Sequence, residues 1–405
     1  MKNFARKLIF KQLADLHFGQ LTIKDKHHTL TFGDKTPTSG LNATIVVHDF
    51  RFYTFVLKGG SLAAAEAYAR GYWDTDNLTS LIRFFLQNQR ILNRFEQGVA
   101  KLVGLFRTLA YQFKRNHQTG SRRNIASHYD LSNDFFATFL DDSMMYSSAI
   151  FPTQDANLNE AARYKLEVIC QKLNLKPSDR VIEIGTGWGG FAIHAAENYG
   201  CHVVTTTISQ QQYDLASQRI AEKNLGAQIT LLKEDYRNLT GQYDKLVSIE
   251  MIEAVGYQYY SQFFESCSRL LKDDGQLLIQ AITIQDQAYE RAKHEVDFIK
   301  QYIFPGSCIP SVTALLNAMT RASDMRLVQL DDIGLHYATT LKRWHDTFQQ
   351  QRPAIMDLGF DERFMRLWAF YFCYCEAGFA EGYLGNVHLH CMKPKARRAE
   401  FALAN

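Results

Sequence analysis

The chain has 405 residues, 46% of them apolar and 21% charged, which is ordinary for a globular protein with room for about two or three domains. Its net charge of +3 lacks the strong basic bias usual for nucleic-acid-binding proteins, so no nucleic-acid partner is expected. No apolar run reaches about 18 residues and no apolar segment follows the basic N-terminus, which argues against a transmembrane helix and a signal peptide. Seven cysteines, an odd number, indicate buried thiols in a cytoplasmic protein, with no disulfide framework and no metal site.

Residues 1–95 are predicted to form a small N-terminal α+β domain. Leu21–Phe32 and Ala43–Leu57 alternate in the manner of strands, whereas Ser61–Tyr68 and Leu78–Leu86 have helical patterns.

A basic amphipathic linker helix is predicted over residues 96–120. Its apolar positions recur at helical spacing and are interspersed with Lys101, Arg107, Lys114 and Arg115. Such a helix can lie on an anionic membrane surface, or it can join two domains with its basic face in water.

Residues 121–405 are predicted to form an α/β domain with a parallel sheet, because strands and helices alternate from Arg180 onward. The expected strands are Arg180–Ile184, His202–Thr206, Ile229–Leu232, Asp244–Ile249 and Gln276–Ile282, with two further strands at Leu327–Leu330 and Val387–Met392. The expected helices are Gly190–Asn198, Ser209–Lys223, Tyr259–Leu271 and Phe360–Phe379. A turn is predicted at Asp273–Gly275, and residues 284–320 form an insertion rich in charge, proline and glycine.

The segment Glu183–Gly190 is a glycine-rich turn between the first of these strands and a helix. Such a turn lets backbone N–H groups approach a nucleotide-like ligand, and its glycines tolerate positive φ. The acid Glu183 suits the amino group of a zwitterion or a ribose hydroxyl. The pattern E-x-G-x-G-x-G differs from the dinucleotide pattern, and Thr205–Thr207 replace the acid that binds ribose about 20 residues later. These features favour S-adenosylmethionine over NAD.

Several segments, in order and at matching spacing, resemble the cyclopropane fatty acid synthase family of S-adenosylmethionine-dependent methyltransferases. The segments are His128–Phe136, Tyr146–Ala149, Glu183–Gly190, Thr207–Ser209, Glu253 with Gly256, Tyr302–Gly306 and Tyr337–Leu341. The resemblance covers residues 120–395 well, and residues 1–95 more loosely. It implies a seven-stranded class I methyltransferase sheet that is Rossmann-like, with the ligand at the point where the strand order reverses.

The resemblance also implies which residues bind the cofactor S-adenosylmethionine. Tyr146 and Ser147 correspond to the residues at its methionine end, and Asp235 and Tyr236 to those that flank the adenine. The complete set is Tyr146, Ser147, Glu183, Gly185, Gly187, Gly189, Thr207, Ile208, Gln212, Asp235, Tyr236 and Ile249.

Members of this family methylate a cis double bond in a phospholipid acyl chain, and a base then takes a proton so that a cyclopropane closes. The base in typical members is a bound bicarbonate, and the resemblance assigns Glu253 and Tyr337 to its site. Here the usual Cys is Ser148, the usual His is Gln280, and a usually small residue is Glu250. Glu250 and Glu253 are three residues apart, a spacing that would bring both to one helical turn.

These departures leave the fate of the proton open. Glu250 adds negative charge where the anion would bind, so bicarbonate binds differently or Glu250 replaces it. A base in a new position would give a methylene- or methyl-branched unsaturated chain in place of a cyclopropane. Alternatively, Glu250 points away and caps the following helix.

Three functions compete for this sequence. The first is methyl transfer to unsaturated phospholipid chains at the inner face of the membrane, with a cyclopropane as the product. A homodimer is compatible with this function. The second is methyl transfer to a small soluble acceptor, and the third is lipid binding without catalysis. The many aromatic residues, 13% of the chain, suit either an aromatic core or a greasy substrate channel.

Overall fold

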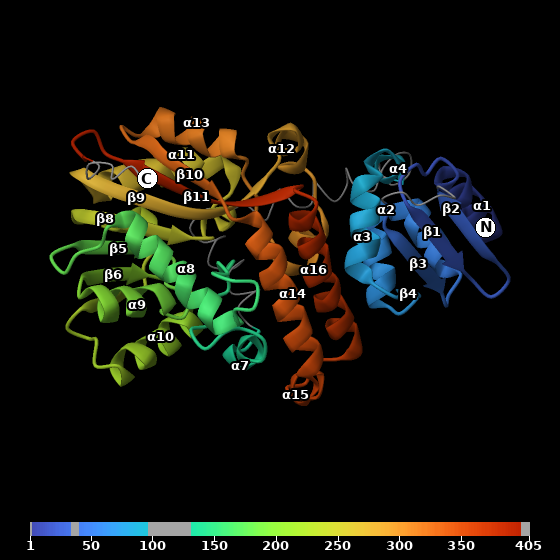
Figure 1. Cartoon of the computed structure of the whole chain (residues 1–405), viewed down its shortest axis with the longest axis horizontal. Coiled ribbons are helices and arrows are strands. Elements are labelled where there is room, and N and C mark those ends of the chain that lie inside the picture. The colour runs from blue at the N-terminus through green and yellow to red at the C-terminus, as the bar shows by residue number, and fades with distance from the viewer. Residues whose placement is uncertain (1, 34–39, 96–130, 398–405) are drawn as a thin grey trace. The chain divides into compact units, whose positions relative to one another are not determined.

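The computed structural model describes residues 2–33, 40–95 and 131–397 (Figure 1). The chain divides into two compact units. The first comprises Met1–Lys114, His294–Pro305 and Ala338–Leu384, and the second comprises Arg115–Lys293, Gly306–Tyr337 and Gly385–Asn405. The predicted linker helix at 96–120 and the start of the His128–Phe136 segment lie outside the described residues. The helix and the domain boundaries beside it therefore stay predictions.

The first unit is built on a four-stranded sheet in the order β2-β1-β3-β4. Strand β1 pairs antiparallel with β2 and parallel with β3, and β3 pairs antiparallel with β4. Its strands are β1 (Gln20–Lys24), β2 (Thr29–Gly33), β3 (Asn42–Val47) and β4 (Trp73–Thr75). Its helices are α1 (Lys2–Leu13), α2 (Arg51–Ala69), α3 (Leu78–Gln87), α4 (Gln89–Phe95), the π-helix η5 (Ile299–Ile303), most of α14 (Gly334–Gln350), α15 (Arg352–Asp357) and α16 (Glu362–Ala380).

The structure corrects two of the predicted N-terminal elements. Leu21–Phe32 is a hairpin of two strands, and the predicted strand Ala43–Leu57 ends at Val47, because α2 begins at Arg51. The apolar run Phe52–Leu57 fits a buried helix as well as a strand, so periodicity alone could not separate the two. Helix α1 was not predicted.

The second unit contains a seven-stranded sheet in the order β10-β11-β9-β8-β5-β6-β7, as predicted for this α/β fold. Its strands are β5 (Arg180–Ile184), β6 (His202–Thr206), β7 (Ile229–Leu232), β8 (Tyr243–Ile249), β9 (Leu271–Ile284), β10 (Arg326–Asp332) and β11 (Leu384–Met392). Its helices are α7 (Asn133–Ala137), α8 (Leu158–Leu173), α9 (Gly190–Tyr199), α10 (Gln210–Glu222), η2 (Tyr236–Asn238), η3 (Ile252–Ala254), η4 (Tyr257–Tyr259), α11 (Tyr260–Leu270), α12 (Asp286–Ala292) and α13 (Val312–Ala322).

The strand order reverses beside β5. The chain passes from β5 to β6 and β7 on one side, and then returns to β8 and β9 on the other side. All four pairings among these five strands are parallel, so their carboxyl ends share one edge of the sheet. Ligands bind at such a reversal point in open α/β sheets. The glycine turn after β5 lies at this point.

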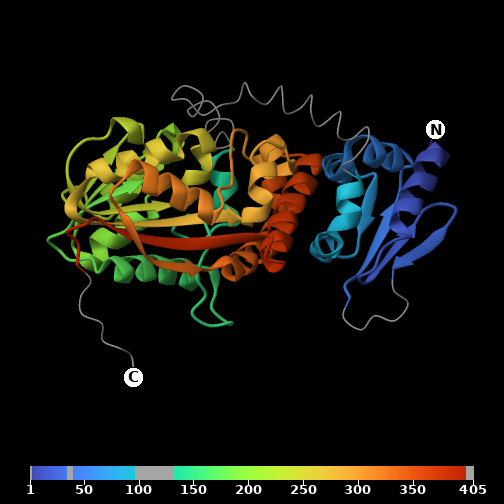
Figure 2. The same ribbon diagram turned by 90° about the horizontal axis from the view of Figure 1, so that it is seen from above.

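Helices cover both faces of the sheet. Figures 1 and 2 show α8 on the face opposite to α13. Helix α8 begins with a capping box, in which Asn157 accepts from the Glu160 backbone and the Glu160 carboxylate accepts from the Asn157 backbone. Helix α10 begins similarly, with the Ser209 hydroxyl accepting from the Gln212 backbone.

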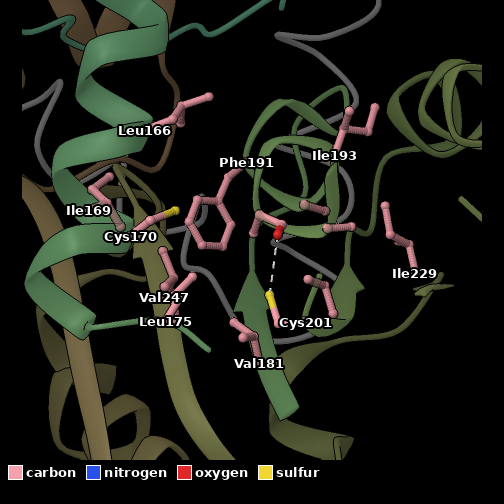
Figure 3. Close-up of a cluster of buried hydrophobic side chains, with 14 of the residues drawn as sticks. Leu166, Ile169, Cys170, Leu175, Val181, Phe191, Ile193, Cys201, Ile229 and Val247 are labelled. Carbon is pink, nitrogen blue, oxygen red and sulfur yellow. Dashed lines mark hydrogen bonds between the residues drawn. The ribbon is translucent and has the colours of Figure 1, made fainter. Parts of the chain in front are cut away.

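An apolar core between α8, α9 and the sheet holds the glycine turn in place (Figure 3). Ile169 and Cys170 of α8 and Phe191 of α9 are fully buried against Val181 of β5 and Val247 of β8. Burial of each such apolar side chain stabilises the fold by roughly 1.5–3 kcal/mol. This packing fixes the start of α9, where the glycine turn ends.

One predicted turn in this unit is wrong. Asp273–Gly275 lies within β9, which begins at Leu271. The β8–β9 register shifts there, since Tyr243 faces Leu271 whereas Lys245 already faces Gln276. The segment is therefore an irregularity within one strand, and the Asp-Asp-Gly sequence marks the bulge.

Candidate active site

The glycine turn closes onto the neighbouring strand. The N–H groups of Gly185 and Thr186 both donate to the carbonyl of Thr206 at the end of β6, at 3.1 and 3.0 Å. Gly185, Gly187 and Gly189 all have positive φ. A Cβ on Gly187 would meet no atom within 4 Å, whereas one on Gly189 would contact Ile193 and Ala216. Gly187 therefore presents open backbone to a ligand, while its neighbours serve the packing.

Glu183 lies inside the sheet at the end of β5. Its Oε2 accepts from the Thr205 hydroxyl at 2.6 Å, and Thr186 in turn donates to Thr205 at 2.6 Å. Burial raises the pKa of Glu183 to about 8, and this rise is opposed by the Thr205 hydrogen bond and the charge of Lys165. Thr205, one of the threonines near the ribose-acid position, thus fixes this carboxyl and is itself held by Thr186 of the glycine turn.

The residues expected near the ribose and adenine are held by local contacts. Thr207 donates through its hydroxyl to Gln212 Oε1 at 2.8 Å, and Arg237 donates twice to the Asp235 carboxylate at 2.7 Å. The hydroxyl of Tyr236 is buried and has no hydrogen-bond partner among the described residues. Such an orphan polar atom costs free energy unless a ligand or water satisfies it. Ile208 and Ile249, also expected here, are partly buried.

Tyr146 and Ser147 follow an aromatic cluster before α8. The Tyr146 ring packs on Phe136, with ring centroids 5.2 Å apart, and Phe136 packs on Trp188 of the glycine turn at the same distance. The Ser147 hydroxyl accepts from Lys165 Nζ of α8 at 2.7 Å. The predicted methionine-end residues thus lie on elements that contact the glycine turn.

Glu250 lies at the centre of the predicted catalytic residues. It has φ of 49° and directly follows β8. Its Oε1 accepts three hydrogen bonds, from the Ser148 backbone at 2.9 Å, Gln280 Nε2 at 2.8 Å and Asn386 Nδ2 at 2.6 Å. Glu250 therefore does not cap the following helix. It also precedes the 3-10 helix η3, which contains Glu253, so the expectation that Glu250 and Glu253 share one helical turn is wrong.

Glu253 lies in η3, with one oxygen bound and one unpartnered. Its Oε1 accepts from the Ile282 backbone of β9 at 2.5 Å, while its Oε2 is buried without a partner among the described residues. Burial and the charge of Glu250 raise the pKa of Glu253 to about 8. Burial also raises the pKa of Glu250, against the hydrogen bonds of Ser148, Gln280 and Asn386 and the charge of Lys165. At neutral pH the pair can therefore hold a proton.

The other three predicted catalytic residues are buried. Gln280 and Ser148 are fully buried; the Gln280 amide donates to the Ser148 carbonyl at 3.2 Å, and the Ser148 hydroxyl donates to the Ala149 carbonyl at 3.0 Å. The structure therefore brings Ser148, Gln280 and Glu250 into direct contact. Tyr337 lies in α14 with 5% of its surface exposed, and its role stays a prediction.

The chain is similar to known proteins, and one family model matches most of it. The family model described as mycolic acid cyclopropane synthetase matches residues 116–389, which is more than half of the chain. The chain belongs to this family. It is an S-adenosylmethionine-dependent methyltransferase with the class I fold.

Three individual proteins illustrate the similarity. The tuberculostearic acid methyltransferase UfaA1 of Mycobacterium tuberculosis is 37% identical over 80% of this chain and 77% of its own length. The cyclopropane-fatty-acyl-phospholipid synthase of Escherichia coli K12 is 36% identical over 83% of this chain and 84% of its own length. A crystal structure of the mycolic acid cyclopropane synthase CmaA1, complexed with SAH and CTAB, is 30% identical with a TM-score of 0.62 and covers 67% of this chain and 98% of its own.

Sequence reasoning missed three polar residues of this family member's site. Asn386 binds Glu250, His388 Nε2 lies 3.0 Å from Gln280 Oε1, and Lys165 binds Ser147. The strand predicted at Val387–Met392 carried a signal, since Asn386, His388 and His390 alternate and so share one face. No comparable signal marked Lys165, because helix α8 itself was not predicted.

The described part of the chain holds no group of three or more His, Cys, Asp or Glu side chains that could bind a metal ion. It also contains no helix long and apolar enough to cross a membrane. The residues fit S-adenosylmethionine, since a Cβ on Gly187 would meet no atom within 4 Å and the buried Tyr236 hydroxyl has no partner among the described residues, so both leave room for a ligand.

Proposed function

We propose that this methyltransferase transfers a methyl group from S-adenosylmethionine to the cis double bond of an unsaturated phospholipid acyl chain. The observation that carries the proposal is the carboxylate pair of partly buried Glu250 and buried Glu253, where β8 ends beside the glycine turn. The names of the two relatives, a cyclopropane-fatty-acyl-phospholipid synthase and a tuberculostearic acid methyltransferase, support a lipid acceptor.

Buried carboxylates suit this reaction because methylation of an alkene leaves a carbocation. When bound, S-adenosylmethionine supplies an electrophilic methyl group. The chain must exclude water, which would trap the cation, and it must place negative charge and aromatic faces near it. Glu250 and Glu253 supply the charge, and Tyr146 with its Phe136 and Trp188 neighbours supplies aromatic surface. The cofactor residues are those predicted from the sequence, with Gly187 and Tyr236 as the positions open to it.

Removal of a proton must then complete the reaction, and we assign this step to the Glu250 carboxylate. Glu250 contacts Ser148 and Gln280, which stand at two of the positions that the resemblance assigns to the bicarbonate site. A bicarbonate anion beside ionised Glu250 would be repelled. Glu253 Oε2, which has no hydrogen-bond partner among the described residues, can act as a second hydrogen-bond acceptor close to Glu250. A bound bicarbonate would need hydrogen-bond donors, and Glu253 in its protonated form would supply one of them.

The product depends on which proton is lost. Loss of a proton from the new methyl group closes a cyclopropane, as the name of the Escherichia coli relative suggests. Loss from a neighbouring chain carbon gives a methyl-branched alkene, and loss after a hydride shift gives a methylene branch. The resident carboxylate Glu250 favours the branched products, as does the name of the 37% identical methyltransferase.

Lipid analysis decides between these products. The chain would be expressed in a bacterial host without its own cyclopropane synthase, and the lipids examined by mass spectrometry and proton NMR. An added mass of one CH₂ per acyl chain supports the reaction, and its absence refutes it. Upfield cyclopropane protons would identify ring closure, whereas olefinic methylene or vinylic methyl signals would identify a branched chain.

We also propose that the protein works peripherally at the inner face of the membrane. The predicted basic helix at 96–120 supports this, and the first unit adds exposed aromatic and basic residues. Phe4 and Phe18 are 66% and 61% exposed, and Lys7 and Lys11 are exposed between them along the sequence. Basic and aromatic side chains together favour an anionic lipid surface. Sedimentation with anionic vesicles tests this, because an enzyme for a small soluble acceptor would remain in the supernatant.

A further inference from the structure

A chain of hydrogen bonds reaches Glu250 through side chains from three elements. Lys172 Nζ of α8 lies 2.8 Å from His388 Nδ1 of β11, and His388 Nε2 lies 3.0 Å from Gln280 Oε1 of β9. Gln280 Nε2 then lies 2.8 Å from Glu250 Oε1. Gln280 and His388 are both fully buried, so water cannot replace these contacts. None of the residues beyond Gln280 has a place in the proposed reaction.

The direction of each hydrogen bond is fixed by the two ends of the chain. A lysine ammonium only donates, so His388 Nδ1 must accept and Nε2 must carry the proton. His388 then donates to Gln280 Oε1, and the amide nitrogen of Gln280 faces the other way. That nitrogen meets two acceptors, Glu250 Oε1 and the Ser148 carbonyl. No other orientation of the amide or tautomer of the imidazole satisfies all of these contacts.

We infer that Lys172 and His388 are positioning residues, which lock the Gln280 amide so that it donates to Glu250 and holds this carboxylate as an ionised proton acceptor. The inference deepens the proposed function and rests on it, since Glu250 is the base of that proposal. It concerns residues that do not touch the reacting atoms and act only through Gln280.

The charges around the chain support this role. Burial, with the charges of Lys172 and Lys165, lowers the pKa of His388 to about 3, so the imidazole stays neutral. Lys172 also pairs with Asp331 of β10 at 2.7 Å, and the negative charge of Asp331 opposes the lowering of the His388 pKa. The charged groups that face Glu250 itself are Lys165 of α8 and Glu253 of η3. Neither lies on the chain from Lys172 to Gln280, so the chain can be broken without removing them.

The same two strands provide a matched control. His390 Nε2 lies 3.1 Å from Gln276 Oε1, and His390 is 4% exposed. This pair repeats the contact of His388 with Gln280, but Gln276 has no described contact with Glu250. Replacing either histidine by leucine removes one buried imidazole from β11, so both variants carry a similar packing change.

The test is the pH dependence of methyl transfer. In His388→Leu the Gln280 oxygen loses its donor and the amide is free to turn, which removes a hydrogen bond from ionised Glu250. The pKa of Glu250 should then rise, so we expect the acid limb of the pH profile of kcat to move up by about one pH unit. On that limb kcat should be about tenfold lower, with KM for lipid unchanged. His388→Gln restores the donor near the Nε2 position and should return the limb toward the wild-type pH. His390→Leu should leave the limb in place.

Lys172→Met removes the donor at the other end of the chain. It should move the limb in the same direction, and Lys172→Met with His388→Leu should move it no further than His388→Leu alone. Additive shifts would show that the two residues act separately and would overturn the inference. An equal shift in His390→Leu would also overturn it, because the effect would then be one of packing.

A second measurement is independent of activity. Infrared spectroscopy can follow the protonated carboxyl of Glu250, assigned by its loss in Glu250→Gln. This signal should titrate at higher pH in His388→Leu than in the wild type or in His390→Leu. Absence of methyl transfer in the wild type would count against the proposed function, whereas an unchanged infrared titration would overturn the inference itself.

Discussion

Lys165 is the residue whose burial most needs an explanation. It is fully buried in α8, and its pKa is lowered to about 8 by burial, against the charges of Glu250, Asp141 and Glu183. Because an ammonium only donates, its contact with Ser147 makes the serine oxygen an acceptor and leaves the serine proton for another partner. Ser147 is thereby prepared to donate to an anionic group, such as the carboxylate of a bound methionine moiety.

Lys165→Met should therefore weaken cofactor binding. The substitution keeps most of the side-chain volume but removes the positive charge and frees Ser147 to turn. We expect the Kd for S-adenosylhomocysteine to rise by about tenfold or more, as isothermal titration calorimetry would measure, since hydrogen bonds to charged groups are worth about 1.5–3 kcal/mol. Lys245→Met is the control, because Lys245 is also a buried lysine of this unit, but its pKa responds to Asp179 and Asp244. Equal losses in both variants would contradict the assignment.

Glu250→Gln should separate catalysis from cofactor binding. The amide can still accept from Ser148, Gln280 and Asn386, but it cannot take a proton. We expect kcat for lipid methylation to fall by about 10²–10⁴-fold, the usual contribution of a general base, with little change in the Kd for S-adenosylhomocysteine. The wild type should also keep its activity in buffer depleted of bicarbonate. Activity that collapses without bicarbonate, or survives in Glu250→Gln, would rule out Glu250 as the base.

At the scale of elements, the sequence predicts best where pattern and turn chemistry agree. Strands β5, β6 and β7 begin and end at the predicted residues, because short β-branched runs lie between clear turns. Helix α8 has a capping box but was not predicted, and the first two turns of α2 were assigned to a strand. Local pattern cannot resolve a buried apolar segment whose partners lie far along the chain.

The same reason limits prediction of the candidate site. Ser148, Glu250 and Gln280 could be named because each stands in a recognisable family motif, and the structure brings them together. Asn386 and His388 alternate in sequence and so share a face, but local pattern could not show that this face meets Gln280, because β11 reaches β9 only through the sheet order. The catalytic roles of all these residues stay predictions until the variants are measured.

The exposed aromatic residues at the start of the first unit yield a prediction at this scale. Phe4 and Phe18 are exposed, with Lys7 and Lys11 between them in the sequence. Phe4→Ser with Phe18→Ser should reduce sedimentation with anionic vesicles, because each phenyl ring contributes apolar area to a lipid surface. Leu358→Ser, at another exposed apolar residue of the first unit, is the control. Equal retention of the double variant and the wild type would exclude this surface from membrane contact.

At the scale of the whole molecule, the buried carboxyls make stability depend on pH. The pKa of Glu253 is raised to about 8 from the ordinary value of 4.5. Between these values the folded state keeps a proton that the unfolded chain has lost, so the free energy of unfolding falls as pH rises. Buried histidines act in the opposite sense. The pKa of His388, for example, is lowered from 6.5 to about 3, so between these values the folded state binds fewer protons than the unfolded chain and the free energy of unfolding rises with pH. The two effects partly cancel in the wild type.

A comparison with Glu253→Gln isolates the carboxyl, because the histidines are common to both proteins. Glutamine cannot ionise, so the variant escapes the destabilisation that builds up as pH rises from about 4.5 to about 8. The variant should therefore gain stability relative to the wild type across this window, by a few kcal/mol at most, and the difference should level off above it. Urea unfolding of the cofactor-free proteins at several pH values in the window measures this difference. A difference that is constant with pH would show that Glu253 ionises normally, and would remove the protonated carboxyl from the proposed site.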